Sequence, residues 1–139
     1  MHHQSLIKYV AAALVCSAGA LSSQDSLAGE KDTQLVSITP ASQFGPANAK
    51  GSLGSARNSA DSVQYMGCQS GFDGTNNWGQ CDAKDSAGHT LSCYTTDSEY
   101  IATIRAMSSQ TFVDFFASPS GDCIGFLLSN DSAEAVPLN

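Results

Sequence analysis

The stretch SVQYMGCQSGFDGTNNWGQCDAKDSAGHTLSCYTT, residues 62 to 96, contains three segments of strand character separated by two turn signals. The three segments are SVQYMGC (62 to 68), WGQCDAK (78 to 84) and HTLSCYTT (89 to 96). In the first segment Val63 and Tyr65 alternate with polar residues, and the glycines of residues 69 to 77 indicate a reversal of the chain. Gly88 can adopt the positive φ that a hairpin loop with a bulge requires. The sequence therefore predicts a three-stranded antiparallel meander.

The segment after the meander predicts one helix. TDSE, residues 96 to 99, fits the capping box S/T-x-x-E, in which the Thr96 hydroxyl accepts a hydrogen bond from the amide of Glu99. Behind this box, apolar side chains recur on one helical face at Tyr100, Ile101, Ile104 and Met107. We expect a helix over residues 97 to 107.

Two further strands are expected after this helix. TFVDFFA, residues 111 to 117, is apolar on both faces, and CIGFLLSN, residues 123 to 130, closes a hairpin. Between them SPSGD, residues 118 to 122, has Pro and Gly where a β-turn accepts them. The predicted fold class is α+β, a small disulfide-stapled domain. Its antiparallel sheet consists of the three-stranded meander plus the C-terminal hairpin, with the one helix covering one face.

The chain of 139 residues has room for one domain, which we expect as a compact unit over residues 62 to 130. Residues 29 to 61 contain few large apolar side chains and predict an extended N-terminal arm or linker. Within it, QLVSIT at 34 to 39 could form one short strand. Composition gives no structural reason for the sequence of residues 55 to 62. The last residues, 131 to 139, predict a frayed tail.

Residues 1 to 28 have the three-part layout of a secretory signal peptide. The apolar run of residues 9 to 21 would span only about 20 Å as a helix, short of the ~30 Å hydrocarbon core of a membrane. Ser26 and Ala28 are the small residues expected just before a cleavage site. We therefore expect a secreted or periplasmic protein that begins near residue 29 after processing.

Cys16 lies inside this apolar run, where a lipid-modified cysteine is the alternative interpretation. A lipoprotein site needs a small residue immediately before the cysteine, but Val15 stands there and the apolar run continues beyond Cys16. We therefore expect Cys16 to be removed with the signal peptide. The four remaining cysteines are an even number in an oxidising compartment, which predicts two disulfides among Cys68, Cys81, Cys93 and Cys123.

The pairing of the four cysteines stays open at this stage. The second turn of the meander places Cys81 opposite Cys93, which leaves Cys68 with Cys123. The first turn places Cys68 opposite Cys81, which leaves Cys93 with Cys123. The third pattern joins the outer strands of the meander across the middle one and fits a flat meander least.

Charge and motif spacing argue against several classes of ligand. The net charge of −7 disfavours nucleic acid and anionic membrane surfaces, which both attract basic proteins. The cysteines are too widely spaced for a zinc site. DGTNN at residues 73 to 77 has the oxygen ligands of a calcium loop, but Trp78 stands where an EF-hand needs Gly. We expect no cofactor, no metal site and no catalytic residue.

The only histidine after the predicted cleavage site is His89, which adjoins a hairpin turn and has no evident buried partner. The aromatic residues of the meander are more informative, because some of them should lie on the sheet face away from the helix: Tyr65, Phe72, Trp78 and Tyr94. Aromatic rows on a sheet bind sugars or proteins, and the alternative is that they form halves of a small core.

These observations favour a non-enzymatic secreted or periplasmic binding module, inhibitor-like or an envelope accessory. Its partner would be an extracytoplasmic protein or a glycan. The alternative is a small secreted hydrolase or toxin-like effector, since acidic residues that could act as paired carboxylates are plentiful. That alternative requires a cleft with converging polar groups, which the binding module does not need.

Three stretches also resemble a known group of sequences. They are GSLGSARNSADSVQYMGC (51 to 68), the C-x12-C-x11-C spacing of Cys68, Cys81 and Cys93, and FASPSGDC (116 to 123). Over about residues 51 to 130 the chain is similar to a family of small exported bacterial proteins. The resemblance implies export and a single disulfide-bonded domain, and it implies no activity, substrate or site.

Overall fold

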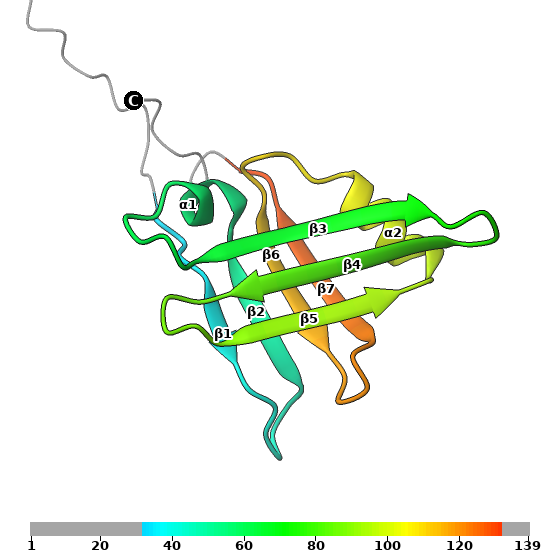
Figure 1. Cartoon of the computed structure of the whole chain (residues 1–139), viewed down its shortest axis with the longest axis horizontal. Helices are drawn as coiled ribbons and strands as arrows, with labels where there is room; N and C mark the ends of the chain where they lie inside the picture. Colours follow the sequence, from blue (N-terminus) through cyan, green and yellow to red (C-terminus); the bar gives the residue numbers. More distant parts are fainter. Residues whose placement is uncertain (1–31, 132–139) are drawn as a thin grey trace, which may run out of the picture.

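The computed structural model describes residues 32 to 131, so the predicted signal peptide with Cys16 and the tail from residue 132 lie outside the described residues. The elements in chain order are β1 (Ser37–Thr39), β2 (Ala47–Ser52), α1 (Leu53–Arg57), β3 (Tyr65–Phe72), β4 (Asn77–Lys84), β5 (Thr90–Thr95), α2 (Ser98–Arg105), β6 (Phe112–Ala117) and β7 (Cys123–Ser129). The strands form two antiparallel sheets, with orders β1-β2-β6-β7 and β3-β4-β5. Figure 1 shows the three-stranded sheet lying across the four-stranded one, with the two sets of strands crossing at a steep angle.

The predicted meander is confirmed as the sheet β3-β4-β5. Its two hairpins place Cys68 opposite Cys81 and Cys81 opposite Cys93. Gly74 and Gly88, one in each connecting turn, have positive φ values of 96° and 89°. Positive φ favours glycine, so the turn signals in the sequence located both reversals.

The prediction of one sheet with one helix is wrong in its arrangement. The hairpin β6–β7 is present, but it pairs with β2 in a separate sheet instead of extending the meander. Val113 and Phe115 of β6 are fully buried, because they lie on the face of their sheet that packs against the meander. Each sheet has an apolar inner face, and stacking the two faces buries both, as in a β-sandwich.

The prediction of an extended arm over residues 29 to 61 is wrong for its described part. This region forms β1, β2 and α1, and β2 lies inside the four-stranded sheet between β1 and β6. Ala49 and Ser52 of β2 are fully buried. A Cβ on Gly51 would lie 3.1 Å from the Cα of Val36, so only a small residue fits there. The small residues that suggested a linker are the ones that close packing of backbones requires.

The tract of residues 55 to 62 is docked on the domain by hydrogen bonds. The Ser55 hydroxyl accepts from the backbone N–H of Gln34 at 3.3 Å, and the Asn58 amide donates to the Gly54 carbonyl at 3.1 Å, at the end of α1. Gln64 is buried and its side-chain oxygen accepts from the backbone N–H of Val36 at 2.9 Å. The bonds of Ser55 and Gln64 attach the segment before β1 to α1 and to the residue before β3, and the bond of Asn58 closes the end of α1, which together supply the structural reason that composition lacks.

Helix α2 is present but begins one residue later than predicted and ends two residues earlier. Its N-cap is Asp97, whose carboxylate accepts from the backbone N–H groups of Glu99 at 2.8 Å and Tyr100 at 3.3 Å. The predicted capping role of Thr96 is therefore wrong, because Asp97 occupies the N-cap position and a carboxylate caps at least as well as a hydroxyl. Among residues 32 to 131, neither helix has the length and apolar content to cross a membrane.

Candidate binding surfaces

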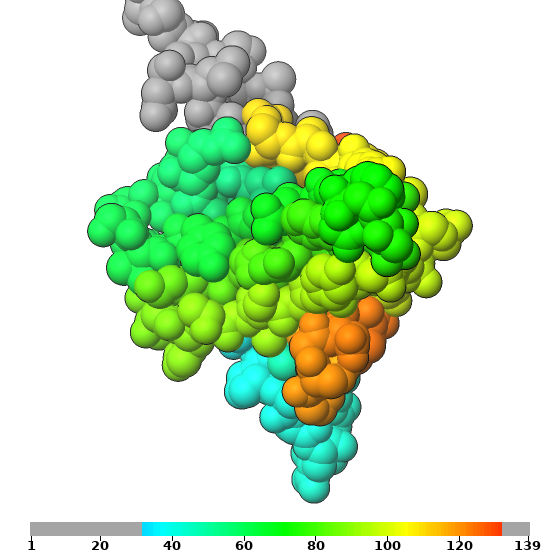
Figure 2. Space-filling model, turned by 45° about the vertical axis from the view of Figure 1, so that its right-hand side comes forward, coloured from blue at the N-terminus to red at the C-terminus, as the bar shows by residue number. Residues whose placement is uncertain are grey.

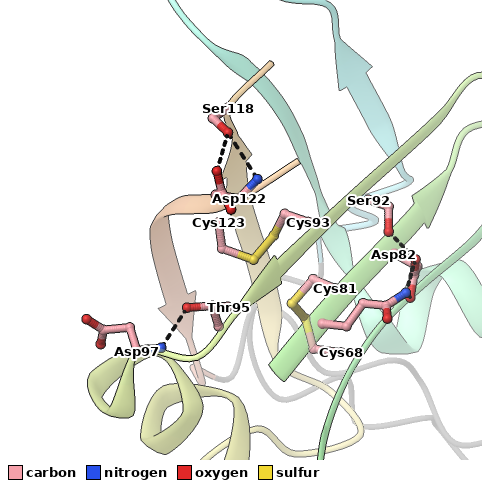
Figure 3. The surroundings of a disulfide bond; sticks show 11 residues. Cys68, Cys81, Asp82, Ser92, Cys93, Thr95, Asp97, Ser118, Asp122 and Cys123 are labelled. Carbon is pink, nitrogen blue, oxygen red and sulfur yellow. Dashed lines mark hydrogen bonds between the residues drawn. A yellow bond between two sulfur atoms is a disulfide. The ribbon is translucent and has the colours of Figure 1, made fainter. Parts of the chain in front are cut away.

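The four predicted disulfide cysteines lie together on the inner side of the meander. Cys68 is bonded to Cys81 and Cys93 to Cys123, which is one of the two pairings that the sequence left open. The first bond joins β3 to β4, and the second joins the two sheets (Figure 3). The backbone N–H of Tyr94 also donates to the carbonyl of Gly121 at 2.8 Å, so the β6–β7 turn lies against the edge of β5. These cysteines have a structural role and leave the opposite face of the meander free.

The outer face of the meander is defined by strand alternation. Residues on β4 with odd numbers point inward, as shown by the burial of Gly79, Cys81 and Ala83. The neighbouring residues therefore point outward, and across the three strands the outer face consists of Tyr65, Gly67, Gln69, Gly71, Trp78, Gln80, Asp82, Lys84, Thr90, Ser92 and Tyr94. No helix or strand of the described chain covers this side in Figure 1. We call it the outer meander face.

Two aromatic rings occupy one end of the outer meander face. The rings of Trp78 and Tyr94 have centroids 6.5 Å apart and planes inclined by 17°. Trp78 lies over Gly71 on β3, where a Cβ would come within 2.7 Å of the indole. Tyr94 is 44% exposed. The nearly parallel rings form a platform, and the absence of a side chain at Gly71 lets the indole lie flat on the sheet.

A cluster of polar side chains lies further along the same face. The Gln80 amide donates to both carboxylate oxygens of Asp82 at 2.9 and 3.0 Å, and the Ser92 hydroxyl donates to one of them (Figure 3). Gly67 is the residue opposite Asp82 on β3, and the space above it is open. Asp82 is thus held in place beside a gap in the side-chain layer, with Tyr65 exposed beyond it.

The structure brings together three of the four aromatic residues that the sequence nominated. Tyr65, Trp78 and Tyr94 share the outer meander face. Phe72 does not, because its register places it on the inner side, at the end of β3, where it is 63% exposed. The polar residues between the rings were not among the predicted site residues. Strand alternation alone would have assigned Gln80 and Asp82 to the same face as Trp78.

His89 forms a pair with Asp85 across the turn between β4 and β5. Its Nδ1 atom lies 2.8 Å from an Asp85 carboxylate oxygen, and its backbone N–H donates to the other oxygen at 2.9 Å. The side-chain hydrogen bond from His89 lowers the pKa of Asp85 below its usual value, and the backbone bond adds to this effect. The His89 side chain is 70% exposed. The pair holds the hairpin turn closed.

The turn predicted at residues 73 to 77 is also closed by hydrogen bonds to an aspartate carboxylate. One carboxylate oxygen of Asp73 accepts from the backbone N–H groups of Thr75 at 2.9 Å and Asn76 at 2.8 Å. These bonds, that of Asn76 first, lower the pKa of Asp73. One of the two carboxylate oxygens of Asp73 is therefore engaged by the turn. Within residues 32 to 131, no three His, Cys, Asp or Glu side chains are grouped so that they could hold a metal ion.

Two hollows of more than 400 Å³ lie at the margins of the two sheets in the described part of the chain. One, of about 440 Å³, is bounded by α1, the start of β3 and the end of α2. The other, of about 450 Å³, is apolar and lies between the start of β5 and the β1–β2 hairpin, with Ile38, Ala47 and Leu91 in its wall and His89 at its margin. The hairpin itself projects from the rest of the molecule in Figure 2, and Phe44 at its tip is 90% exposed.

No family model, curated protein or solved structure matches this chain.

Proposed function

We propose that the protein is a non-enzymatic extracytoplasmic binding module and that its outer meander face binds a glycan. The observation that carries this proposal is the combination of exposed aromatic rings with a fixed row of amide, carboxylate and hydroxyl groups on one uncovered sheet face. Aromatic faces pack against the C–H groups of a sugar ring, and the polar groups can exchange hydrogen bonds with its hydroxyls. The two disulfides support the assignment to an oxidising compartment.

The charge on the face favours a ligand that is neutral over most of its length. Only Asp82 and Lys84 are charged there, and their charges cancel. Tyr65 pairs with Lys84 at one end of β4, and Trp78 lies six residues away at the other. At a rise of ~3.3 Å per residue the aromatic ends are roughly 20 Å apart, so the face suits an extended chain better than a single sugar.

The alternative of a small secreted hydrolase has its best-placed acid–base pair in His89 and Asp85. Both side chains hydrogen-bond within their own turn, and His89 is mostly exposed. A catalytic acid–base pair is held toward a substrate inside a cleft, whereas the imidazole of this pair lies on an exposed turn. The geometry therefore supports the binding module better.

Trp78 is the only tryptophan in the chain, so its fluorescence reports directly on the proposed site. We expect soluble peptidoglycan strands, chitin oligosaccharides or cello-oligosaccharides to change the emission of Trp78 in a saturable way. Tyr94→Ala and Asp82→Asn should weaken the binding that is observed. Phe44→Ala is the matched control, because it removes an exposed aromatic ring from the other sheet. Glycan binding that is equal in Tyr94→Ala and the unaltered protein would refute the site, and capture of a protein on this face alone would refute the ligand class.

A further inference from the structure

The free edge of β3 presents unpaired backbone groups. The Cα atoms of Cys68 and Cys81 are 4.0 Å apart, the close spacing of a non-hydrogen-bonded pair in an antiparallel ladder. The N–H and C=O of Cys68 therefore point away from β4, and so do those of Met66 and Ser70, two residues to either side. Within residues 32 to 131, no strand pairs with this edge and no hydrogen bond reaches these groups. The opposite edge, on β5, is held by the β6–β7 turn.

The hollow of about 440 Å³ runs beside this free edge. Figure 1 shows α1 near the start of β3 and α2 toward its other end. The apolar residues of the lining are Leu53, Ala56, Met66, Ile104 and Met107. Met107 is partly exposed, and methionine side chains adapt to different apolar partners. An extended segment laid along β3 would thus direct alternate side chains into an apolar groove.

Arg57 lies at the rim of the same groove. Its side chain is exposed, and among residues 32 to 131 it forms no ion pair with an acidic side chain. A cation in this position, in a protein of net charge −7, selects locally for a carboxylate on the segment that binds. The net charge also disfavours a second copy of this chain as the occupant, because two copies repel each other.

We propose that β3 and the groove bind an extended segment of a partner protein by strand addition. The backbone of the segment pairs with Met66, Cys68 and Ser70, an apolar side chain enters the groove against Met107, and a carboxylate of the segment pairs with Arg57. Main-chain pairing supplies affinity in this mode, and the groove supplies specificity. The groove shares Tyr65 and Gly67 with the outer meander face, but Arg57, Ser70 and Met107 lie outside that face, so the variants at these three positions test it independently of glycan binding.

The test uses a displayed library of random short peptides, selected on the purified protein. We expect enriched peptides to alternate apolar and polar residues and to include an acidic residue. A synthetic enriched peptide should slow hydrogen exchange at the amides of Met66, Cys68 and Ser70. The amides of Gly67 and Gln69, which face β4, should be slow with and without peptide.

Three variants locate the binding by fluorescence anisotropy of the labelled peptide. Ser70→Pro removes the backbone N–H at the free edge without removing a bond to β4. It should weaken peptide binding about tenfold, the effect of losing about one hydrogen bond. Ser70→Ala is the matched control and should bind as the unaltered protein does. Met107→Glu should abolish binding, and Arg57→Ala should weaken it about threefold, the effect of an exposed ion pair.

If Ser70→Pro does not fold, a peptide N-methylated at its β3-facing amides tests the same bond on the unaltered protein. Equal binding of the N-methylated peptide, or equal binding to Met107→Glu, would overturn the proposal. The proposal would also be overturned if the peptides selected from the library bound the protein elsewhere than at the β3 edge. Slow exchange of the three amides without added peptide would also overturn the proposal. If this protection depends on protein concentration, a second copy of the chain covers the edge. If it does not, the chain's own termini cover it.

Discussion

Cys81 and Cys93 lie directly opposite each other on β4 and β5, yet they are not bonded to each other. Positions across antiparallel strands alternate between close and wide pairs. Because Cys81 and Cys68 form a close pair on one side of β4, Cys81 and Cys93 form a wide, hydrogen-bonded pair on the other. A disulfide needs Cβ atoms within about 4.5 Å, which favours the close pair. Cys93 instead reaches Cys123 in the facing sheet.

This geometry predicts the products of proteolysis under non-reducing conditions. Mass spectrometry should find peptides joined through Cys68–Cys81 and Cys93–Cys123. Peptides joined through Cys81–Cys93 would contradict the register.

Replacing the pair Cys93 and Cys123 by alanine should destabilise the protein more than replacing Cys68 and Cys81. The longer bridge spans 30 residues against 13, a difference of about 0.7 kcal/mol in loop entropy alone.

The cap of α2 predicts different effects for two neighbouring residues. Asp97→Ala should lower the free energy of unfolding by about 1 kcal/mol, because two backbone N–H groups lose their acceptor. Thr96→Ala should change it by less than about 0.5 kcal/mol, the usual range for an exposed site without such bonds. Urea denaturation of both variants measures this. Equal midpoints would mean that the helix is capped elsewhere.

The buried side chain of Gln64 predicts that the segment before β1 is essential to the domain. Its oxygen accepts from the N–H of Val36, and its amide donates to Asp61. Gln64→Ala should therefore cost about 1 to 3 kcal/mol, since the buried amide of Val36 loses its acceptor. Gln69→Ala, on the exposed face of β3, is the control and should be nearly neutral. A neutral Gln64→Ala would restore the interpretation of this region as a loose arm.

The turn aspartates predict how stability depends on pH. The pKa of Asp61 is lowered by hydrogen bonds, the backbone N–H of Gln64 first, and the pKa values of Asp73 and Asp85 are also lowered from 3.8. A carboxyl with a lowered folded pKa binds a proton more readily in the unfolded chain. Its contribution is therefore complete above about pH 5 and is lost as the pH falls through the lowered folded value.

Thermal melts between about pH 2 and 7 measure this loss. Asp73→Asn should reduce the acid sensitivity of the melting temperature and lower stability at neutral pH. Thr75→Ala, in the same turn, is the comparison variant, because it keeps the backbone N–H that bonds to Asp73 and should leave the pH profile nearly unchanged. An Asp73→Asn profile with the same slope in acid would show that the turn bonds do not favour the charged form.

Part of each candidate site follows from the local sequence pattern, and part depends on tertiary packing. Tyr65, Trp78 and Tyr94 could be nominated from the sequence, because strand alternation is local. Phe72 lies on the opposite face, because β3 continues unbroken to Phe72 and the seven residues from Tyr65 are an odd number. The groove beside β3 could not be predicted, because its walls come from α1 and from the end of α2, which are distant in the sequence.

The sequence by itself determined the meander, its two turns, the C-terminal hairpin and α2, because alternation, positive-φ glycines and apolar periodicity act between near neighbours. It also limited the four cysteines to two plausible pairings. Only the tertiary structure decided that β6 and β7 pair with β2, and that Cys93 bonds to Cys123 in the other sheet. The physical reason is close packing across the core. Ala49 and Gly51 look like linker residues until a second backbone and the facing sheet are placed against them.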